Sequence, residues 1–146
     1  FEDSARGVIT SIDWAIVVVD PTTAAIQMAF NLRDMVDQIK AGRLPATKHL
    51  ETPELVDWAN RIFREATVKD VLVVLNRVRD DEMETYVRRK LAEKGLEPIG
   101  IIHEDPAIAR SWLEGTRLET TNTREDVGRI VERVEAVATR SGAIAV

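Results

Sequence analysis

Asp20 and Asn76 are the residues best placed to do chemistry, because each directly follows an uninterrupted apolar run. Asp20 comes after Ala15–Val19, and Asn76 comes after Val71–Leu75. Apolar runs without alternation, each followed by a helical pattern, are typical of buried parallel strands in an α/β sheet. In such sheets, ligands bind at the carboxyl ends of the strands. The sequence therefore predicts a functional site where these two strands end.

Four other kinds of site find little support in the sequence. A phosphate-binding P-loop needs a lysine and a hydroxyl after its last glycine, but two isoleucines follow Gly100. No G-x-G-x-x-G motif for a dinucleotide is present, and no G-x-S-x-G motif for acyl transfer. His49 and His103 do not pair at a metal-ligand spacing, and the chain has no cysteine. We therefore expect no metal site in this chain.

The basic run Arg88-Arg89-Lys90 has two interpretations, an anion-binding patch or the charged end of a helix. Only residues three or four apart share a helix face, and Glu84 lies four residues before Arg88. We interpret the run as a salt-bridged helix end.

Length and composition predict a single globular domain over residues 1–146, with 45% hydrophobic and 31% charged residues. The net charge of −5 does not favour nucleic acid as a partner. The longest apolar run is far shorter than the ~20 residues that cross a membrane. The lack of cysteine fits a cytoplasmic location. Because the chain begins at Phe1 and its first clear element is an interior-type strand, we expect a preceding part of the protein to be missing.

The elements that must position the strand ends alternate between strands and helices. An N-cap hydroxyl at Thr52, followed by proline, marks one helix start, and Gly42, Gly95 and Gly115 mark helix ends. Strands are expected at about 14–19, 70–75 and 97–102, and helices at about 23–41, 53–66, 80–94, 106–113 and from 123 onward, with a loop over 43–51. This order predicts an α/β fold with a parallel sheet and flanking helices.

The last helix is expected to open with a near capping box formed by Thr123 and Asp126. Its apolar stripe repeats at helical spacing and is expected to face the core. The stripe consists of Val127, Ile130, Val131, Val134 and Val137.

Five segments together resemble part of a known family. They are SARGV at 4–8, DWAIVVVDPT at 13–22, VLVVLNRV at 71–78, GLEPIGIIHED at 95–105 and GTRL at 115–118. The chain resembles the C-terminal half of the MinD/ParA-type deviant P-loop ATPases, and most closely the CooC-type accessory ATPases of carbon monoxide dehydrogenase maturation. The resemblance implies a partial P-loop NTPase-like, Rossmann-like three-layer sandwich, with a helical insertion at about 42–68.

The resemblance also implies a nucleotide site on the adenine side, with ATP or ADP as its ligand. Asn76 matches the family's adenine-recognising asparagine, and Arg77 follows it. The loop His103-Glu104-Asp105 matches the segment that frames the other side of the base, and Asp20, Pro21 and Thr22 match the strand-end turn nearby.

Each of these positions also has a purely structural interpretation. Asn76 is equally suited to satisfying the turn after a strand, which is a common use of asparagine. Asp20 is better suited to accepting hydrogen bonds in a turn or at a helix start than to acting as a catalytic acid. Asp105, followed by proline, is chiefly a helix start.

The chain departs from the family pattern in ways that limit its activity. The sequence lacks the glycine-rich P-loop with its lysines, the switch aspartate, and the paired cysteines with which CooC-type members bind metal. His103 replaces a proline of the family loop, and Ala5 replaces a glycine. Without phosphate and magnesium ligands, we expect weak or no ATP binding and no hydrolysis by this chain alone. ATPase activity requires completion by an N-terminal half.

The resemblance implies a partner as well. In the family, the P-loop strand lies next to the strand that matches Trp14–Val19, so this apolar strand is left with one unpaired edge. Such an edge invites pairing with another chain. We expect it to be covered by a second copy in a homodimer, by a separate P-loop half, or by residues at either terminus.

Two functions from different classes follow. The first is the nucleotide-facing half of a CooC/MinD-like ATPase that assists metal-cofactor (nickel) insertion into a metalloenzyme client. The second is a non-catalytic protein-interaction module on a degenerate ATPase scaffold, because a fold does not by itself carry a function.

Overall fold

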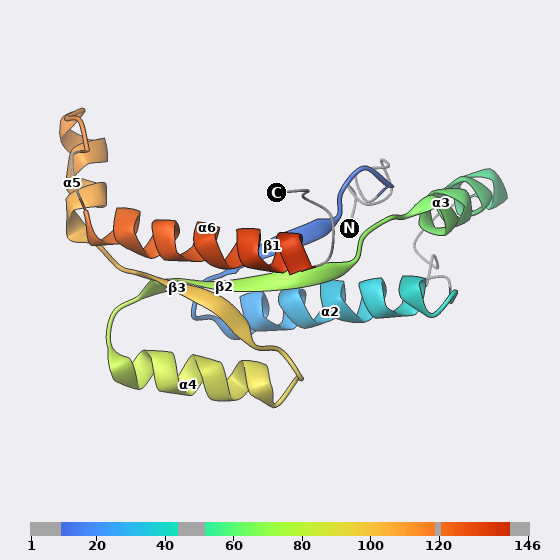
Figure 1. The fold of residues 1–146 in the computed structure, drawn as a ribbon, viewed down its shortest axis with the longest axis horizontal. Coiled ribbons are helices and arrows are strands. Elements are labelled where there is room, and N and C mark those ends of the chain that lie inside the picture. Colours follow the sequence, from blue (N-terminus) through green and yellow to red (C-terminus); the bar gives the residue numbers. More distant parts are fainter. Residues whose placement is uncertain (1–9, 44–51, 119–120, 141–146) are drawn as a thin grey trace. The chain divides into compact units, whose positions relative to one another are not determined.

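The computed structural model describes residues 10–43, 52–118 and 121–140 and confirms the α/β fold class. Its three strands lie in the order β1-β2-β3, with β2 and β3 parallel (Figure 1). The elements are β1 (Trp14–Val19), α2 (Thr23–Lys40), α3 (Pro53–Glu65), β2 (Asp70–Val78), α4 (Asp81–Ala92), β3 (Pro98–His103), α5 (Pro106–Glu114) and α6 (Asn122–Arg140).

The described residues group into two compact units. The first holds residues 10–15, 30–43 and 52–71, and the second holds 16–29, 72–118 and 121–140. Every residue predicted for the nucleotide site belongs to the second unit.

Ion pairs and a helix cap organise the first unit. The Thr52 hydroxyl accepts a hydrogen bond from the backbone N–H of Leu55 at 3.3 Å, which confirms the predicted start of α3. Arg33 pairs with Asp70 at 2.8 Å. Lys69 pairs with Asp13 at 2.9 Å, and its ammonium group lies 4.9 Å from the centre of the Trp14 ring. The predicted loop over 43–51 lies outside the described residues except for its first position.

The second unit contains the main hydrophobic core, with β2 at its centre. Leu72, Val73, Val74 and Leu75 are all buried, as expected for a strand covered on both faces. Figure 1 shows α6 on one face of the sheet and α4 on the other.

The edge strand β1 differs from β2, because alternate side chains along it are exposed. Val19 is fully buried, whereas Ile16 and Val18 are 51% and 57% exposed. Successive side chains of a strand point to opposite faces. One face of β1 is therefore covered within the described structure, and the other is open.

The second strand is longer than predicted and irregular at its end. The sequence indicated a strand that stops at Leu75, whereas β2 continues to Val78. Its pairing with β3 shifts register between Leu75 and Val78, and Arg77 has a φ of 56°, in the left-handed region. A bulge of this kind lets the strand bend while pairing resumes beyond it.

The predicted capping box of the last helix is wrong. Thr121 caps α6, because its hydroxyl accepts from the backbone N–H of Arg124 at 3.2 Å. Asp126 is instead a buried residue of the face that packs against the sheet, together with Ile130. The helix is consequently turned relative to the expected stripe, so that Val127 and Val131 are 42% and 47% exposed.

Close packing of β3 against α6 gives a test of this arrangement. A Cβ atom at Gly100 would overlap the side chain of Ile130, so Gly100→Ala is expected to lower the free energy of unfolding by about 1–3 kcal/mol. Gly128→Ala on α6 is the matched control, because nothing lies within 4 Å of its added Cβ. Alanine favours a helix over glycine by up to about 1 kcal/mol. Urea unfolding curves with equal stability for wild type and Gly100→Ala would contradict the packing.

Candidate functional site

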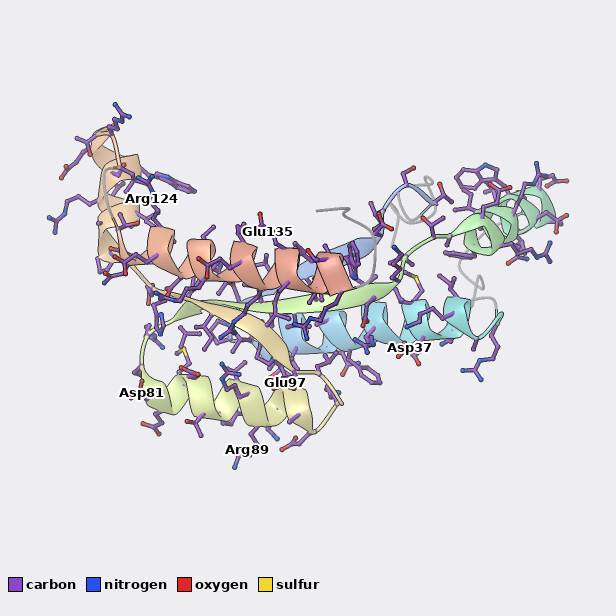
Figure 2. The ribbon with its side chains drawn as sticks, viewed as in Figure 1. Asp37, Asp81, Arg89, Glu97, Arg124 and Glu135 are labelled. Carbon is purple, nitrogen blue, oxygen red and sulfur yellow. The ribbon has the colours of Figure 1, made fainter. Side chains whose placement is uncertain are left out.

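A hollow of about 320 Å³ lies at the carboxyl ends of the strands, where the sequence predicted a site. In Figure 2, Asp81 in the first turn of α4 marks this end of the sheet. We call the hollow the strand-end hollow. It is lined by Asp20, Pro21, Thr22, Arg77, Arg79, Met83 and Glu104. The structure thus brings the turn after β1, the end of β2 and the residue after β3 to one place.

A side-chain hydrogen bond joins the ends of β1 and β2. The amide Nδ2 of Asn76 donates to Oδ1 of Asp20 at 2.9 Å. Asn76 does not line the hollow itself but holds one of its walls. The Asn76 side chain therefore bonds to the residue that follows the neighbouring strand, and does not satisfy a turn after its own strand.

Part of the Asn76 amide has no hydrogen-bond partner within the described residues. A primary amide has two N–H donors and one oxygen acceptor. Among the described residues, its Oδ1 has no partner, and no buried side-chain oxygen or nitrogen there lacks one. The Oδ1 atom is therefore open to solvent and can accept a hydrogen bond.

The turn after β1 is fixed by the start of α2. The Thr22 hydroxyl accepts from the backbone N–H of Ala25 at 3.1 Å, so Thr22 caps this helix. The backbone N–H of Thr22 donates to the carbonyl of Asp20 at 2.6 Å. Because Thr22 does the capping, the Asp20 carboxylate is free to accept from Asn76.

Two arginines and a glutamate also line the hollow. The carboxylate of Glu104 lies 3.6 Å from a guanidinium nitrogen of Arg77 and 3.9 Å from one of Arg79. The backbone N–H of Glu104 donates to the carbonyl of Val78 at 2.9 Å, which holds the loop against β2. The left-handed backbone of Arg77 is unusual for a residue with a side chain, and such conformations gather at functional sites.

His103 and Asp105, the neighbours of Glu104, do not line the strand-end hollow. The Asp105 carboxylate accepts from the backbone N–H of Ala107 at 2.9 Å, which confirms its interpretation as the start of α5. His103 turns toward α6 instead. The predicted loop therefore contributes one of its three side chains to this hollow.

Asp126 anchors the end of β3 to α6. Its Oδ2 accepts from the backbone N–H of His103 at 2.8 Å and lies 2.9 Å from the His103 ring nitrogen Nδ1, while Oδ1 accepts from Arg129. Its side chain is only 3% exposed. Burial pushes the pKa of Asp126 upward, but the hydrogen bonds from His103 and Arg129 outweigh this effect, so the pKa lies below its ordinary value.

Sequence reasoning missed three residues. Arg79 and Met83 line the hollow because the bulged strand continues past Asn76, which the apolar pattern does not reveal. Asp126 had a usable signal, since it lies four residues before Ile130 and hence on the apolar face of the helix.

No protein-family model matches this chain, and a search of curated proteins gives no match either. Within residues 10–43, 52–118 and 121–140, no three His, Cys, Asp or Glu side chains gather in a way that could hold a metal ion. Across that same part of the chain, every helix is too short or too polar to cross a membrane.

The Asp126 network should make stability depend on pH. The pKa of Asp126 is lower in the folded state than in the unfolded state, where it is near 4. Asp126 therefore stabilises the fold at pH values above its unfolded pKa, and this stabilisation is lost as the pH falls through its folded pKa. Asp126→Asn is expected to lower the free energy of unfolding at pH 7 by about 1–3 kcal/mol and to flatten its decline in acid. Asp57→Asn, an exposed position on α3, is the control. Parallel stability–pH curves for wild type and Asp126→Asn would refute this role.

Proposed function

We propose that this chain is the adenine-side half of a nucleotide-binding domain of the MinD/ParA type, closest to the CooC-type accessory ATPases. The observation that carries the proposal is the Asn76–Asp20 hydrogen bond beside the strand-end hollow. It puts an amide that can read a base edge next to a turn and a loop that the family uses for the same ligand.

The chemistry of the site suits an adenine base. The N6 amino group of adenine donates and its N7 accepts, which complements the free Oδ1 and the second N–H of Asn76. Pro21 and Met83 supply apolar surface for the face of the ring. The hollow, at about 320 Å³, falls at the lower end of the roughly 300–1,000 Å³ typical of small-molecule sites.

In this proposal, the chain does not hydrolyse ATP by itself. Phosphoryl transfer depends on a phosphate cradle and a magnesium ion to stabilise the developing charge. The sequence carries no P-loop, so the phosphates and the metal are assigned to a separate N-terminal half. Joined to that half, the protein would be a cytoplasmic ATPase that assists metal-cofactor assembly in a client enzyme.

Calorimetric titration with ADP, AMP and adenosine tests the nucleotide site. All three ligands are expected to bind weakly and with similar affinity, because the contacts are to the base. Asn76→Ala should weaken binding about tenfold or more, since it removes the base contact and leaves Asp20 without its donor. Asn60→Ala on α3 is the matched control. Binding that is absent at millimolar ligand, or unchanged in Asn76→Ala, would reject the proposal.

The open face of β1 is the surface proposed for docking of a P-loop half. Within the described residues β1 is an edge strand of the sheet with no partner on its outer side, and its exposed Ile16 and Val18 offer an apolar face beside that edge. On α6, the Arg133 side chain donates to the carbonyl of Ile99 on β3, the other edge strand. The exposed Val127 and Val131 lie on the side of α6 that faces away from β3. A strand and helix of a P-loop half would pair with β1 and cover these side chains.

Self-association of the chain tests this surface. An uncovered apolar edge is expected to pair weakly with a second copy, so the apparent mass in light scattering should rise with concentration. Val18→Lys should abolish the rise by placing a charge on the open face. Leu55→Lys, on the exposed part of α3, is the control and should leave it unchanged. A wild-type chain that stays monomeric at high concentration would count against this surface.

A non-catalytic interaction module is the second candidate function. It is favoured by Trp112 and Leu113 at the end of α5, which are 82% and 89% exposed. Large apolar side chains this exposed are typical of partner surfaces when they adjoin one another. The titration with nucleotides separates the two functions, because a module of this kind has no need of a base contact at Asn76.

A further inference from the structure

We propose that this chain has a second ligand site, for a phosphate-type oxyanion, in a basic hollow beside β3. The hollow measures about 150 Å³ and is distinct from the strand-end hollow. It is lined by Arg88 of α4, by Gly100, Ile101 and His103 of β3, and by Asp126, Arg129, Ile130 and Arg133 of α6. The proposal does not depend on the nucleotide site.

Three elements bring the basic side chains together. Arg129 and Arg133 are four residues apart and therefore share one face of α6. A guanidinium N–H of Arg133 donates to the carbonyl of Ile99, which turns this face toward the outer edge of β3 in the described sheet. Arg88 approaches from α4, which covers the other face of the sheet (Figure 1).

The positive charge in this hollow is not fully neutralised. The Asp126 carboxylate is already occupied by His103 and Arg129, and Glu84 holds the Nε of Arg88 at 2.7 Å. Three guanidinium groups thus face two carboxylates, and Arg133 has no acidic partner among the described residues. An excess of positive charge is unexpected on composition alone, since the whole chain carries −5.

Unused donors remain for an anion. The two terminal nitrogens of Arg88 have no partner in the part of the chain that the structure describes. The side chains of Arg88 and Arg129 are 38% and 60% exposed, so a ligand can reach them from solvent. The guanidinium group presents paired N–H donors that match two oxygens of a phosphate.

Size restricts the ligand to a single anionic group. The hollow is about half the roughly 300 Å³ at which sites for whole drug-sized molecules begin. It therefore suits one phosphate group, free or as the end of a phosphate ester, rather than an entire nucleotide.

Heteronuclear NMR titration of the chain with inorganic phosphate, at constant ionic strength set with sodium chloride, tests this site. Saturable shifts are expected for the backbone amides of Ile101, His103 and Arg129–Arg133. Arg133→Gln and Arg88→Gln should each weaken the response fivefold or more. Arg110→Gln, an exposed arginine on α5, removes the same charge elsewhere and should leave it unchanged.

A second arm with AMP identifies the source of the phosphate. Shifts in the basic hollow with AMP as well as phosphate would support a phosphate ester, and shifts with phosphate alone would support the free ion. Absence of saturable shifts, equal shifts from chloride alone, or an unchanged response in both Arg133→Gln and Arg88→Gln would overturn the site. Asn76→Ala should not alter the phosphate response, so a failure of the nucleotide site leaves this test intact.

Discussion

The hydrogen bond between Asn76 and Asp20 is the interaction on which the strand-end site depends. Both side chains are short, so they meet at 2.9 Å only if the residue that follows β1 lies level with Asn76 of β2. A partly buried carboxylate is costly unless it is hydrogen-bonded, and Asn76 supplies that bond. The turn Asp20-Pro21-Thr22 and the helix that Thr22 caps are thereby held beside the end of β2.

The buried carboxylate of Asp126 plays the equivalent part for β3. It joins the last residue of the strand to α6 through His103, and the next residue, Glu104, then donates from its backbone to Val78. Two neighbouring residues consequently line different hollows: His103 lines the basic hollow and Glu104 lines the strand-end hollow. The two proposed sites thus rest on one anchored strand end, but their ligands would be recognised by different groups.

Local signals in the sequence predicted most of the elements but not the details at their ends. The apolar run before Asp20, the Thr52 cap and the glycine after α5 specify structure within a few residues, and each matches the fold. The bulge at Arg77 depends on pairing between distant strands, so no short pattern reveals it. Spacing predicted Asp126 as a capping residue, because spacing alone does not show which face of a helix a tertiary contact will bury.

Backbone amide shifts on titration with ADP test the central claim most directly. The account predicts saturable shifts at Asp20–Thr23, Asn76–Arg79 and Glu104, the segments that meet at the strand-end hollow, whether or not the phosphate end of ADP also binds in the basic hollow. Their disappearance in Asn76→Ala, with the rest of the spectrum preserved, would place the base at this site. Shifts restricted to other parts of the molecule, or none at millimolar ADP, would contradict the account.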